Sequence, residues 1–196
     1  MDARQSRRGK RISLQQEKQA ATDLGGRTMA ASGATRLGGG GDVRVLGKTR
    51  LECKFTEKSS YALKYEELKK IRRQAIKALE SPVFQFAFRH TSGRLRAYAV
   101  IPWDVEDPQK TNDDIWFTSA ASIMLTEDQL EKALMRGRIQ LTFAHAGPEP
   151  QAFRQFEILR WHDYVEVMSM KQSEALEDAR DQHSIRVPGA PDSSER

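Results

Sequence analysis

Residues 42–55, DVRVLGKTRLECKF, alternate between polar and apolar side chains on both sides of a central glycine, and this pattern predicts a β-hairpin. The apolar side chains stand at odd positions: Val43, Val45, Leu51, Cys53 and Phe55. The polar ones stand at even positions: Asp42, Arg44, Glu52 and Lys54. Because alternate side chains of a strand point to opposite faces, one face joins the core and the other carries the charges. The odd side chains of both strands share one face, and the even ones the other, only if the two strands are paired in a suitable register. Most simply, Val43 lies opposite Leu51 or Cys53, around a turn of three or five residues that contains Gly47.

This register brings the carboxylates of Asp42 and Glu52 to one face, with Lys54 two residues further on. Two carboxylates at one place repel each other unless a cation or a proton compensates them. Mg²⁺ is a suitable cation, since it takes oxygen ligands from one or two carboxylates and from phosphate groups. An alternative interpretation has no functional site: these residues would form a solvent-exposed ion pair that contributes little to the stability of the fold.

The remaining sequence predicts helices and strands in a mixed order. Ser13 and Gln16 form a capping-box pattern at the start of a helix that ends at Gly25-Gly26. A short strand is expected over 27–32, followed by a glycine-rich loop. An amphipathic helix with a basic outer surface is expected over 59–80, followed by two alternating strands around TSG at 91–93. The expected fold class is α/β, with a mixed central sheet flanked by helices.

The region after residue 106 contains a weak internal echo. SSYALKYEELKKI at 59–71 resembles ASIMLTEDQLEKA at 121–133, and FAFRH…RAYAVIPWDVE resembles LTFAH…RQFEILRWHDYVE. We therefore divide the chain into a basic disordered arm (1–12), a core (13–106), a helix-strand-strand extension that partly repeats 59–106 (107–170) and a polar tail (171–196). Within that tail, SEALEDAR could extend a terminal helix.

The amino-acid composition indicates which kind of partner the protein binds and in which cellular compartment it is expected. The formal charge of +5 among 196 residues favours an anionic partner. A single cysteine, Cys53, excludes an intramolecular disulfide and a thiol cluster for zinc, which indicates a reducing compartment. Because no apolar stretch approaches a membrane span and no signal-peptide core follows the basic start, we expect a cytoplasmic protein without a membrane partner.

Read in order, the residues resemble the PD-(D/E)XK nuclease superfamily, in the branch of archaeal and bacteriophage Holliday junction resolvases. The resemblance runs over residues 15–71 and more loosely to about 106. Its elements are a helical Glu17, the Ser32-Gly33-Ala34 segment, the Gly-Asp-Val step at Asp42 and the Glu-x-Lys of Glu52 and Lys54. Gly41 stands where restriction-enzyme members often carry proline, which suits the resolvase branch.

The resemblance implies a restriction-endonuclease-like fold and specific roles. Asp42, Glu52 and the carbonyl of Cys53 would hold Mg²⁺, with Mn²⁺ as a substitute, and Glu17 would assist the metal site. Lys54 would position or activate the attacking water, and Ser32 would contact the backbone or the active centre. The protein would be a homodimeric, metal-dependent endodeoxyribonuclease, encoded by a phage or a cell, that cuts branched or double-stranded DNA in recombination and repair.

Basic residues supply candidate phosphate contacts on both sides of this site. They are Arg7, Arg8, Lys10, Arg11, Lys58, Lys64, Lys69, Lys70, Arg72, Arg73 and Lys77. Since the sequence contains no base-reading module, recognition of DNA structure is the better expectation. Three functions stay open: a junction-resolving nuclease, a nuclease of the same fold acting on flaps, nicks or ends, and a non-catalytic DNA-binding scaffold. The histidines and Trp103, Trp116 and Trp161 are interpreted as structural, and Cys53 as an inert core thiol.

Overall fold

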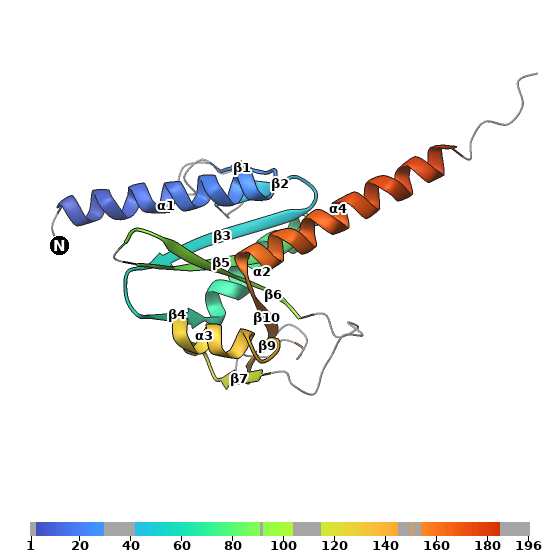
Figure 1. Cartoon of the computed structure of the whole chain (residues 1–196). Helices are drawn as coiled ribbons and strands as arrows, with labels where there is room; N and C mark the ends of the chain where they lie inside the picture. Colours follow the sequence, from blue (N-terminus) through green and yellow to red (C-terminus); the bar gives the residue numbers. More distant parts are fainter. Residues whose placement is uncertain are drawn as a thin grey trace, which may run out of the picture.

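The computed structural model describes residues 3–29, 42–90, 92–103, 115–144, 150 and 154–184. These residues form a mixed α/β fold (Figure 1). The helices are α1 (Ala3–Asp23), α2 (Tyr65–Lys77), α3 (Glu127–Leu134) and α4 (Trp161–Ser184). The strands are β1 (Arg27–Thr28), β2 (Val43–Val45), β3 (Thr49–Thr56), β4 (Ser60–Lys64), β5 (Ser81–Arg89), β6 (Leu95–Pro102), β7 (Ile115–Ser119), β8 (Ser122–Thr126), β9 (Ile139–Phe143) and β10 (Gln155–Arg160).

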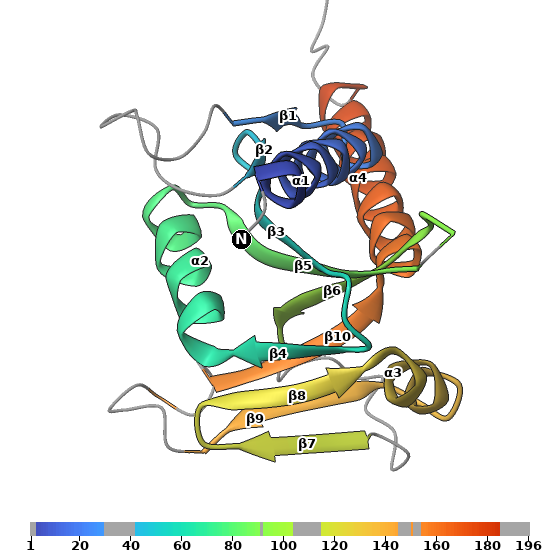
Figure 2. The same cartoon turned by 90° about the vertical axis from the view of Figure 1, so that its left-hand side faces the viewer.

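Eight strands make one sheet in the order β1-β2-β3-β5-β6-β10-β9-β7, and helices cover both of its faces (Figure 2). On one face α1 and α4 pack on Leu51, Cys53 and neighbouring apolar side chains. On the other face α2, α3 and the two-stranded sheet β4-β8 enclose a larger core rich in phenylalanine. The expected α/β class with a mixed central sheet is confirmed, since the sheet contains both parallel and antiparallel pairs.

The hairpin follows the predicted register. Val43 lies opposite Leu51 and Val45 opposite Thr49, around a three-residue turn in which Gly47 has a φ of 67°. The odd side chains Val43, Leu51 and Cys53 are buried against α1 and α4. The even side chains therefore project toward the face that carries α2.

The described elements repeat. β3-β4-α2-β5-β6 is followed by β7-β8-α3-β9-β10, and β3 pairs with β5 in parallel just as β7 pairs with β9. The two units meet where β6 pairs with β10 and β4 with β8, both antiparallel. The β4-β8 register centres on Ala62 opposite Met124, the residues that the sequence echo also aligns. In the second unit β7, with the sequence IWFTS, stands at the position of β3 and carries neither carboxylate nor amine, so the acidic face is not duplicated there.

Two expectations about helices are wrong. The first helix begins at Ala3, so residues 3–12 are helical rather than a disordered arm. Ser13 does not cap this helix; its hydroxyl donates to Glu17, one turn further on, at 2.8 Å. Ile12 is buried, which shows that tertiary packing extends this helix beyond the capping pattern.

The second error is at 59–80, where the expected single helix is strand β4 followed by α2. β4 is held by β8, a partner some 60 residues away that local periodicity cannot reveal. Consequently Leu68, Ile71 and Ala75 are buried, whereas Ile76 and Leu79 are 49% and 89% exposed. The strand expected over 27–32 is described only as β1, and residues 30–41 lie outside the described part of the chain.

At the other end of the chain, α4 includes the segment SEALEDAR as a helical extension and projects away from the sheet (Figure 1). No helix in the described ranges is long and apolar enough to cross a membrane.

Gly26 sits where α1 meets the hairpin, and it leads to a prediction about stability. A β-carbon at Gly26 would lie 2.9 Å from both the Arg44 carbonyl oxygen and the Val45 Cγ2 atom. We expect Gly26→Ala to lower the free energy of unfolding by about 1 to 3 kcal/mol, because the hairpin must shift to relieve this overlap. Gly9→Ala is the matched control, since a β-carbon there meets nothing within 4 Å and alanine favours a helix. Urea unfolding measures both, and equal stability of the two variants would contradict the prediction.

Candidate functional site

The charged face of the hairpin brings together Asp42, Glu52 and Lys54. Asp42 directly precedes β2, and its N–H donates to the Leu51 carbonyl at 2.7 Å, one residue before Glu52 on the neighbouring strand. The Cys53 N–H donates to a carboxylate oxygen of Asp42 at 2.7 Å, which fixes that side chain at the strand edge. The Lys54 ammonium donates to Glu52 Oε1 at 2.6 Å. The two acids and the lysine therefore lie close enough to one another to interact electrostatically.

Burial and mutual charge control protonation in this group. Burial raises the pKa of the Asp42 carboxyl; the Cys53 N–H opposes this effect, and the negative charge of Glu52 adds to it. Burial lowers the pKa of Lys54, but its hydrogen bond to Glu52 and the charges of Glu52, Asp42 and Glu67 outweigh burial, so the pKa rises overall. Lys54 therefore stays an ammonium at neutral pH, in which form it donates hydrogen bonds and does not accept a proton.

The resemblance also names Glu17, Cys53 and Ser32 as site residues, and these differ in their relation to Asp42. Glu17 lies on α1 and contributes its negative charge to the raised pKa of Asp42. Cys53 is a buried free thiol whose pKa is raised well above its usual value, chiefly by burial, as expected of an inert core cysteine. Ser32, Gly33, Ala34 and Gly41 lie outside the described residues.

The donor set fits a hard divalent cation. In the described ranges no group of three or more His, Cys, Asp or Glu side chains is arranged to hold a metal. Asp42 and Glu52 nevertheless give two neighbouring carboxylates, and the negative charge of Glu52 helps to raise the pKa of Asp42. Two carboxylates with one backbone carbonyl, that of Cys53, are sufficient protein ligands for Mg²⁺, which retains several waters.

The candidate phosphate contacts fall into two groups. Arg8, Lys10, Arg11, Lys58, Lys64, Lys70, Arg73 and Lys77 are exposed. Lys69 and Arg72 are half-buried: Lys69 lies 3.8 Å from Glu66 and over the Tyr65 ring, and Arg72 lies over the Phe156 ring. The side chain of Arg7 lies outside the described residues. The exposed group is better placed to meet an anionic partner than Lys69 and Arg72.

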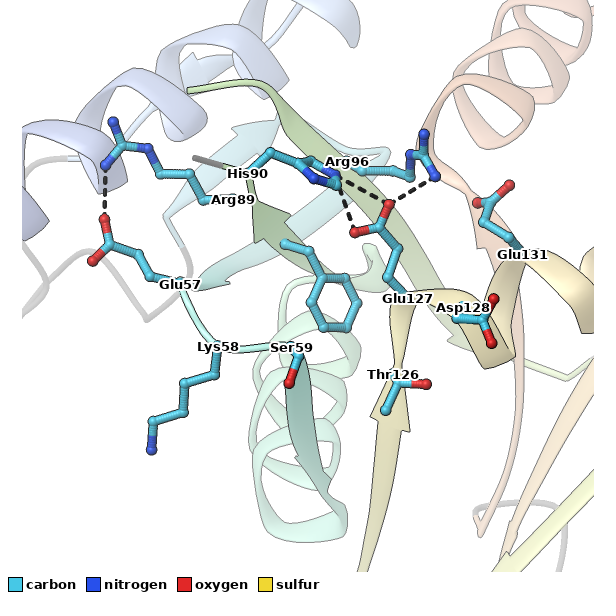
Figure 3. A pocket seen from close by; sticks show the side chains of 11 residues that line it. Glu57, Lys58, Ser59, Arg89, His90, Arg96, Thr126, Glu127, Asp128 and Glu131 are labelled. Atoms are coloured by element: carbon cyan, nitrogen blue, oxygen red, sulfur yellow. Dashed lines mark hydrogen bonds and ion pairs between the residues drawn. The ribbon is translucent and has the colours of Figure 1, made fainter. Parts of the chain in front are cut away.

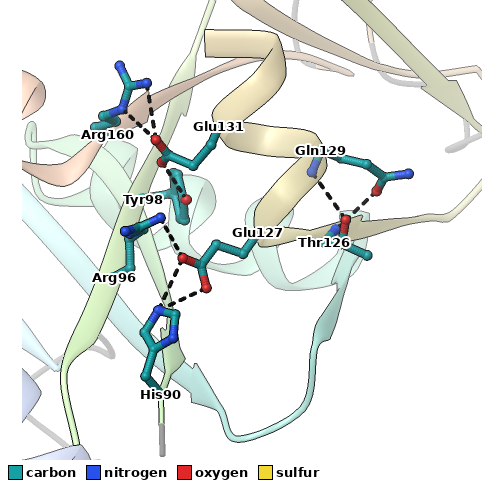
Figure 4. A network of polar contacts seen from close by, with 8 residues as sticks. All are labelled: His90, Arg96, Tyr98, Thr126, Glu127, Gln129, Glu131 and Arg160. Carbon is teal, nitrogen blue, oxygen red and sulfur yellow. Dashed lines mark hydrogen bonds and ion pairs between the residues drawn. The ribbon is translucent and has the colours of Figure 1, made fainter. Parts of the chain in front are cut away.

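A polar pocket of about 620 Å³, separate from the acidic face, lies where the two repeated units meet (Figure 3). Glu127 of α3 binds His90, just after β5, at 3.0 Å and Arg96 of β6 at 2.7 Å, so that one carboxylate joins α3 to these two neighbouring segments (Figure 4). One helical turn further on, Glu131 accepts hydrogen bonds from Tyr98 at 2.7 Å and from Arg160 at 3.2 Å. The negative charges of Glu127 and Glu131 are thus balanced by partners within the protein. Because these partners come from the sheet strands and their ends, the network holds α3 against the sheet. The interpretation of His90 as a structural histidine agrees with this position.

Several residues near the acidic face were not identified from the sequence. Gln16 is buried, and its amide donates to the Lys54 carbonyl at 3.0 Å and to Gln85 at 2.9 Å, so it ties α1 to the site strand. Glu67 acts electrostatically on Lys54, and the Tyr61 hydroxyl hydrogen-bonds Glu67 at 3.5 Å. Gln16 looked like a capping residue, and Tyr61 and Glu67 looked like members of one helix. Recognising β4 as a strand would have directed attention to Tyr61.

No protein-family model matches the sequence, and no curated protein matches it.

Proposed function

We propose that the protein is a Mg²⁺-dependent, structure-selective DNA endonuclease with a restriction-endonuclease-like fold, which resolves Holliday junctions or related branched DNA by phosphodiester hydrolysis. One observation carries the proposal: the Asp42 carboxylate is bound to the backbone of the strand that carries Glu52 and Lys54, and the Lys54 ammonium lies 2.6 Å from Glu52. This is the constellation to which the resemblance to the PD-(D/E)XK nucleases points.

The chemistry follows from the charges of these groups. Hydrolysis joins a water oxygen to phosphorus and breaks the bond to one ester oxygen, while negative charge grows on the phosphoryl oxygens. Mg²⁺, held by Asp42, Glu52 and the Cys53 carbonyl, would draw charge from the phosphate and lower the pKa of the attacking water. Lys54, kept as an ammonium by its acidic neighbours, donates a hydrogen bond to the water or to the developing charge. Glu17 supplies additional negative potential from α1.

DNA is the proposed substrate because exposed cations accompany the acidic face. Lys58 and Lys64 follow the site strand, and Lys70, Arg73 and Lys77 lie on α2. Contacts of lysine and arginine with phosphates do not depend on base sequence and weaken as salt increases. The proposed enzyme acts as a homodimer, because each junction requires two cuts and the described part of each chain has one acidic face of this kind.

The proposal is tested by incubating the purified protein with a labelled four-way junction and with a linear duplex of the same sequence, each with Mg²⁺ and with EDTA. Paired, metal-dependent cuts in the junction alone are expected. If the junction and the linear duplex are cut equally, the protein is a general nuclease and not a junction-selective one. Tight binding of the junction without cleavage in Mg²⁺ or Mn²⁺ would contradict the proposal and favour a DNA-binding scaffold.

A further inference from the structure

Gln16 is a polar side chain on the face of α1 that packs against the sheet. Among the described side chains of this helix, the buried ones are Ile12, Gln16, Ala20 and Ala21. Gln16 is 4% exposed, and its amide oxygen has no hydrogen-bond partner among the described residues. Because burying an amide costs free energy that burying an apolar side chain does not, packing alone does not explain a glutamine at this position.

The amide nitrogen of Gln16 reaches the strand that carries the acidic face. It donates to the Lys54 carbonyl at 3.0 Å and to the side-chain oxygen of Gln85 at 2.9 Å. Gln85 belongs to β5, the strand beside β3, and is itself 2% exposed. Gln16 therefore holds the backbone of Lys54 from the helix layer that covers the sheet.

This contact falls in a part of β3 that has a strand partner on one side only. β5 pairs with β3 along its whole length, whereas β2 pairs with residues 49–51 alone. In the part of the chain that the structure describes, residues 52–56 thus have a neighbouring strand on the β5 side and none on the other. A strand segment paired on one side shifts more easily than one paired on both. The hydrogen bond from Gln16 to the Lys54 carbonyl therefore contributes to the position of this segment.

We infer that Gln16 is a positioning residue, which holds the Lys54 backbone so that the ammonium meets the reacting phosphate at the right place. This inference rests on the proposed function, because it requires Lys54 to act on a phosphate. In this role Gln16 acts through the Lys54 carbonyl and touches neither the metal nor the DNA. A displacement of about 1 Å at the reacting groups can slow an enzyme roughly 100-fold. Loss of the contact should therefore lower the rate of cleavage more than the affinity for DNA.

Gln16→Met tests the inference, since methionine fits a helix and has a side chain of the same length without the amide. We expect the single-turnover rate of junction cleavage in Mg²⁺ to fall about 10- to 100-fold, while the dissociation constant of the junction in EDTA changes by less than about threefold. Gln85→Met is the matched control, because it removes the neighbouring buried amide and leaves the contact with the Lys54 carbonyl in place. Its cleavage rate should stay within about threefold of that of the unmodified protein.

A double variant with Lys54→Met separates action through Lys54 from a general loosening of the fold. If Gln16 acts through the Lys54 ammonium, Gln16→Met should slow cleavage by less than about twofold once that ammonium has been removed. The full loss of rate in the Lys54→Met background would overturn the inference. So would equal cleavage rates of Gln16→Met and the unmodified protein.

A variant without either buried amide separates the effect on the rate from an effect on folding. Replacing both partners of a buried hydrogen bond by apolar side chains is nearly neutral for stability. Gln16→Met combined with Gln85→Met should therefore unfold at the urea midpoint of the unmodified protein, yet cleave the junction as slowly as Gln16→Met. Cleavage by this stable double variant at the unmodified rate would overturn the inference.

Hydrogen exchange without DNA or metal distinguishes failure of this inference from failure of the proposed function. The backbone amides of residues 53–55 should exchange faster in Gln16→Met than in Gln85→Met, and equal exchange would overturn the positioning role. If the unmodified protein cuts the junction and Gln16→Met cuts it equally well, the proposed function stands and only the role of Gln16 is wrong. If the unmodified protein cuts no DNA in Mg²⁺ or Mn²⁺, the proposed function is wrong and the role of Gln16 falls with it.

Discussion

Lys54→Met is expected to slow junction cleavage by about 100- to 1,000-fold while leaving junction binding within a few-fold of the unmodified protein. Methionine keeps an unbranched side chain only one atom shorter than lysine but removes the ammonium that donates to Glu52 at 2.6 Å and would face the reacting phosphate. The expected loss lies in the single-turnover rate, since the ammonium matters most when charge develops on the phosphoryl oxygens. A rapid-quench measurement with protein in excess over labelled junction provides this rate.

The matched control for this variant is Lys132→Met. Lys132 lies on α3, its side chain is 67% exposed, and it pairs with Asp128 one turn earlier in the same helix. It should retain the full rate of cleavage. If Lys54→Met cleaves the junction as fast as Lys132→Met, the ammonium has no part in the chemistry. If it instead loses binding and cleavage in the same proportion, Lys54 is a DNA contact only.

Glu80→Ala is expected to lower the free energy of unfolding by about 3 to 5 kcal/mol, the largest stability effect predicted for this chain. The Glu80 carboxylate has no exposed surface, and it binds Arg44 and, at 2.9 Å, Arg50. Arg44 and Arg50 lie opposite each other in the hairpin, so one buried acid secures both strands of the candidate site. Alanine would leave Arg50, which is 5% exposed, without this compensating charge.

Urea unfolding compares Glu80→Ala with Glu166→Ala, a substitution of an exposed acid on α4 that should change stability by less than about 0.5 kcal/mol. Burial raises the pKa of Glu80, but the hydrogen bonds and charges of Arg44 and Arg50 outweigh it and hold the pKa below 4.5. This stabilisation is therefore complete above about pH 4.5 and is lost as the pH falls through the folded-state pKa. The stability difference between the unmodified protein and Glu80→Ala should shrink below that pH. A constant difference at every pH would contradict the role of the ionised carboxylate.

The hairpin could be predicted in detail because its determinants are local. Alternation assigns each residue to a face, and the requirement that Val43 and Leu51 share a core fixes the register in which these two residues lie opposite each other. The same argument places Cys53 in the core, where it is 3% exposed.

The features that could not be predicted, strand β4 and several residues around the site, depend on partners that are distant in the sequence. β4 looks like the start of a helix because its strand character comes from pairing with β8. Glu80 and Glu67 could not be distinguished from ordinary helix-end and helix-surface acids, since their partners belong to other elements. Gln16 reads as a capping residue, although its amide reaches Lys54 and Gln85, 38 and 69 residues away. Long-range pairing of this kind cannot be inferred from local propensity.

The central claim is that the Asp42–Glu52 face is a metal-dependent centre for cutting branched DNA. Its most direct test is the rate of four-way junction cleavage by the unmodified protein and by Asp42→Asn, each across a range of Mg²⁺ concentrations and in EDTA. The account predicts paired cuts that rise with Mg²⁺ and disappear in EDTA and in Asp42→Asn, while both proteins bind the junction. Cleavage by Asp42→Asn at the unmodified rate, or no cleavage by the unmodified protein at any Mg²⁺ concentration, would contradict it.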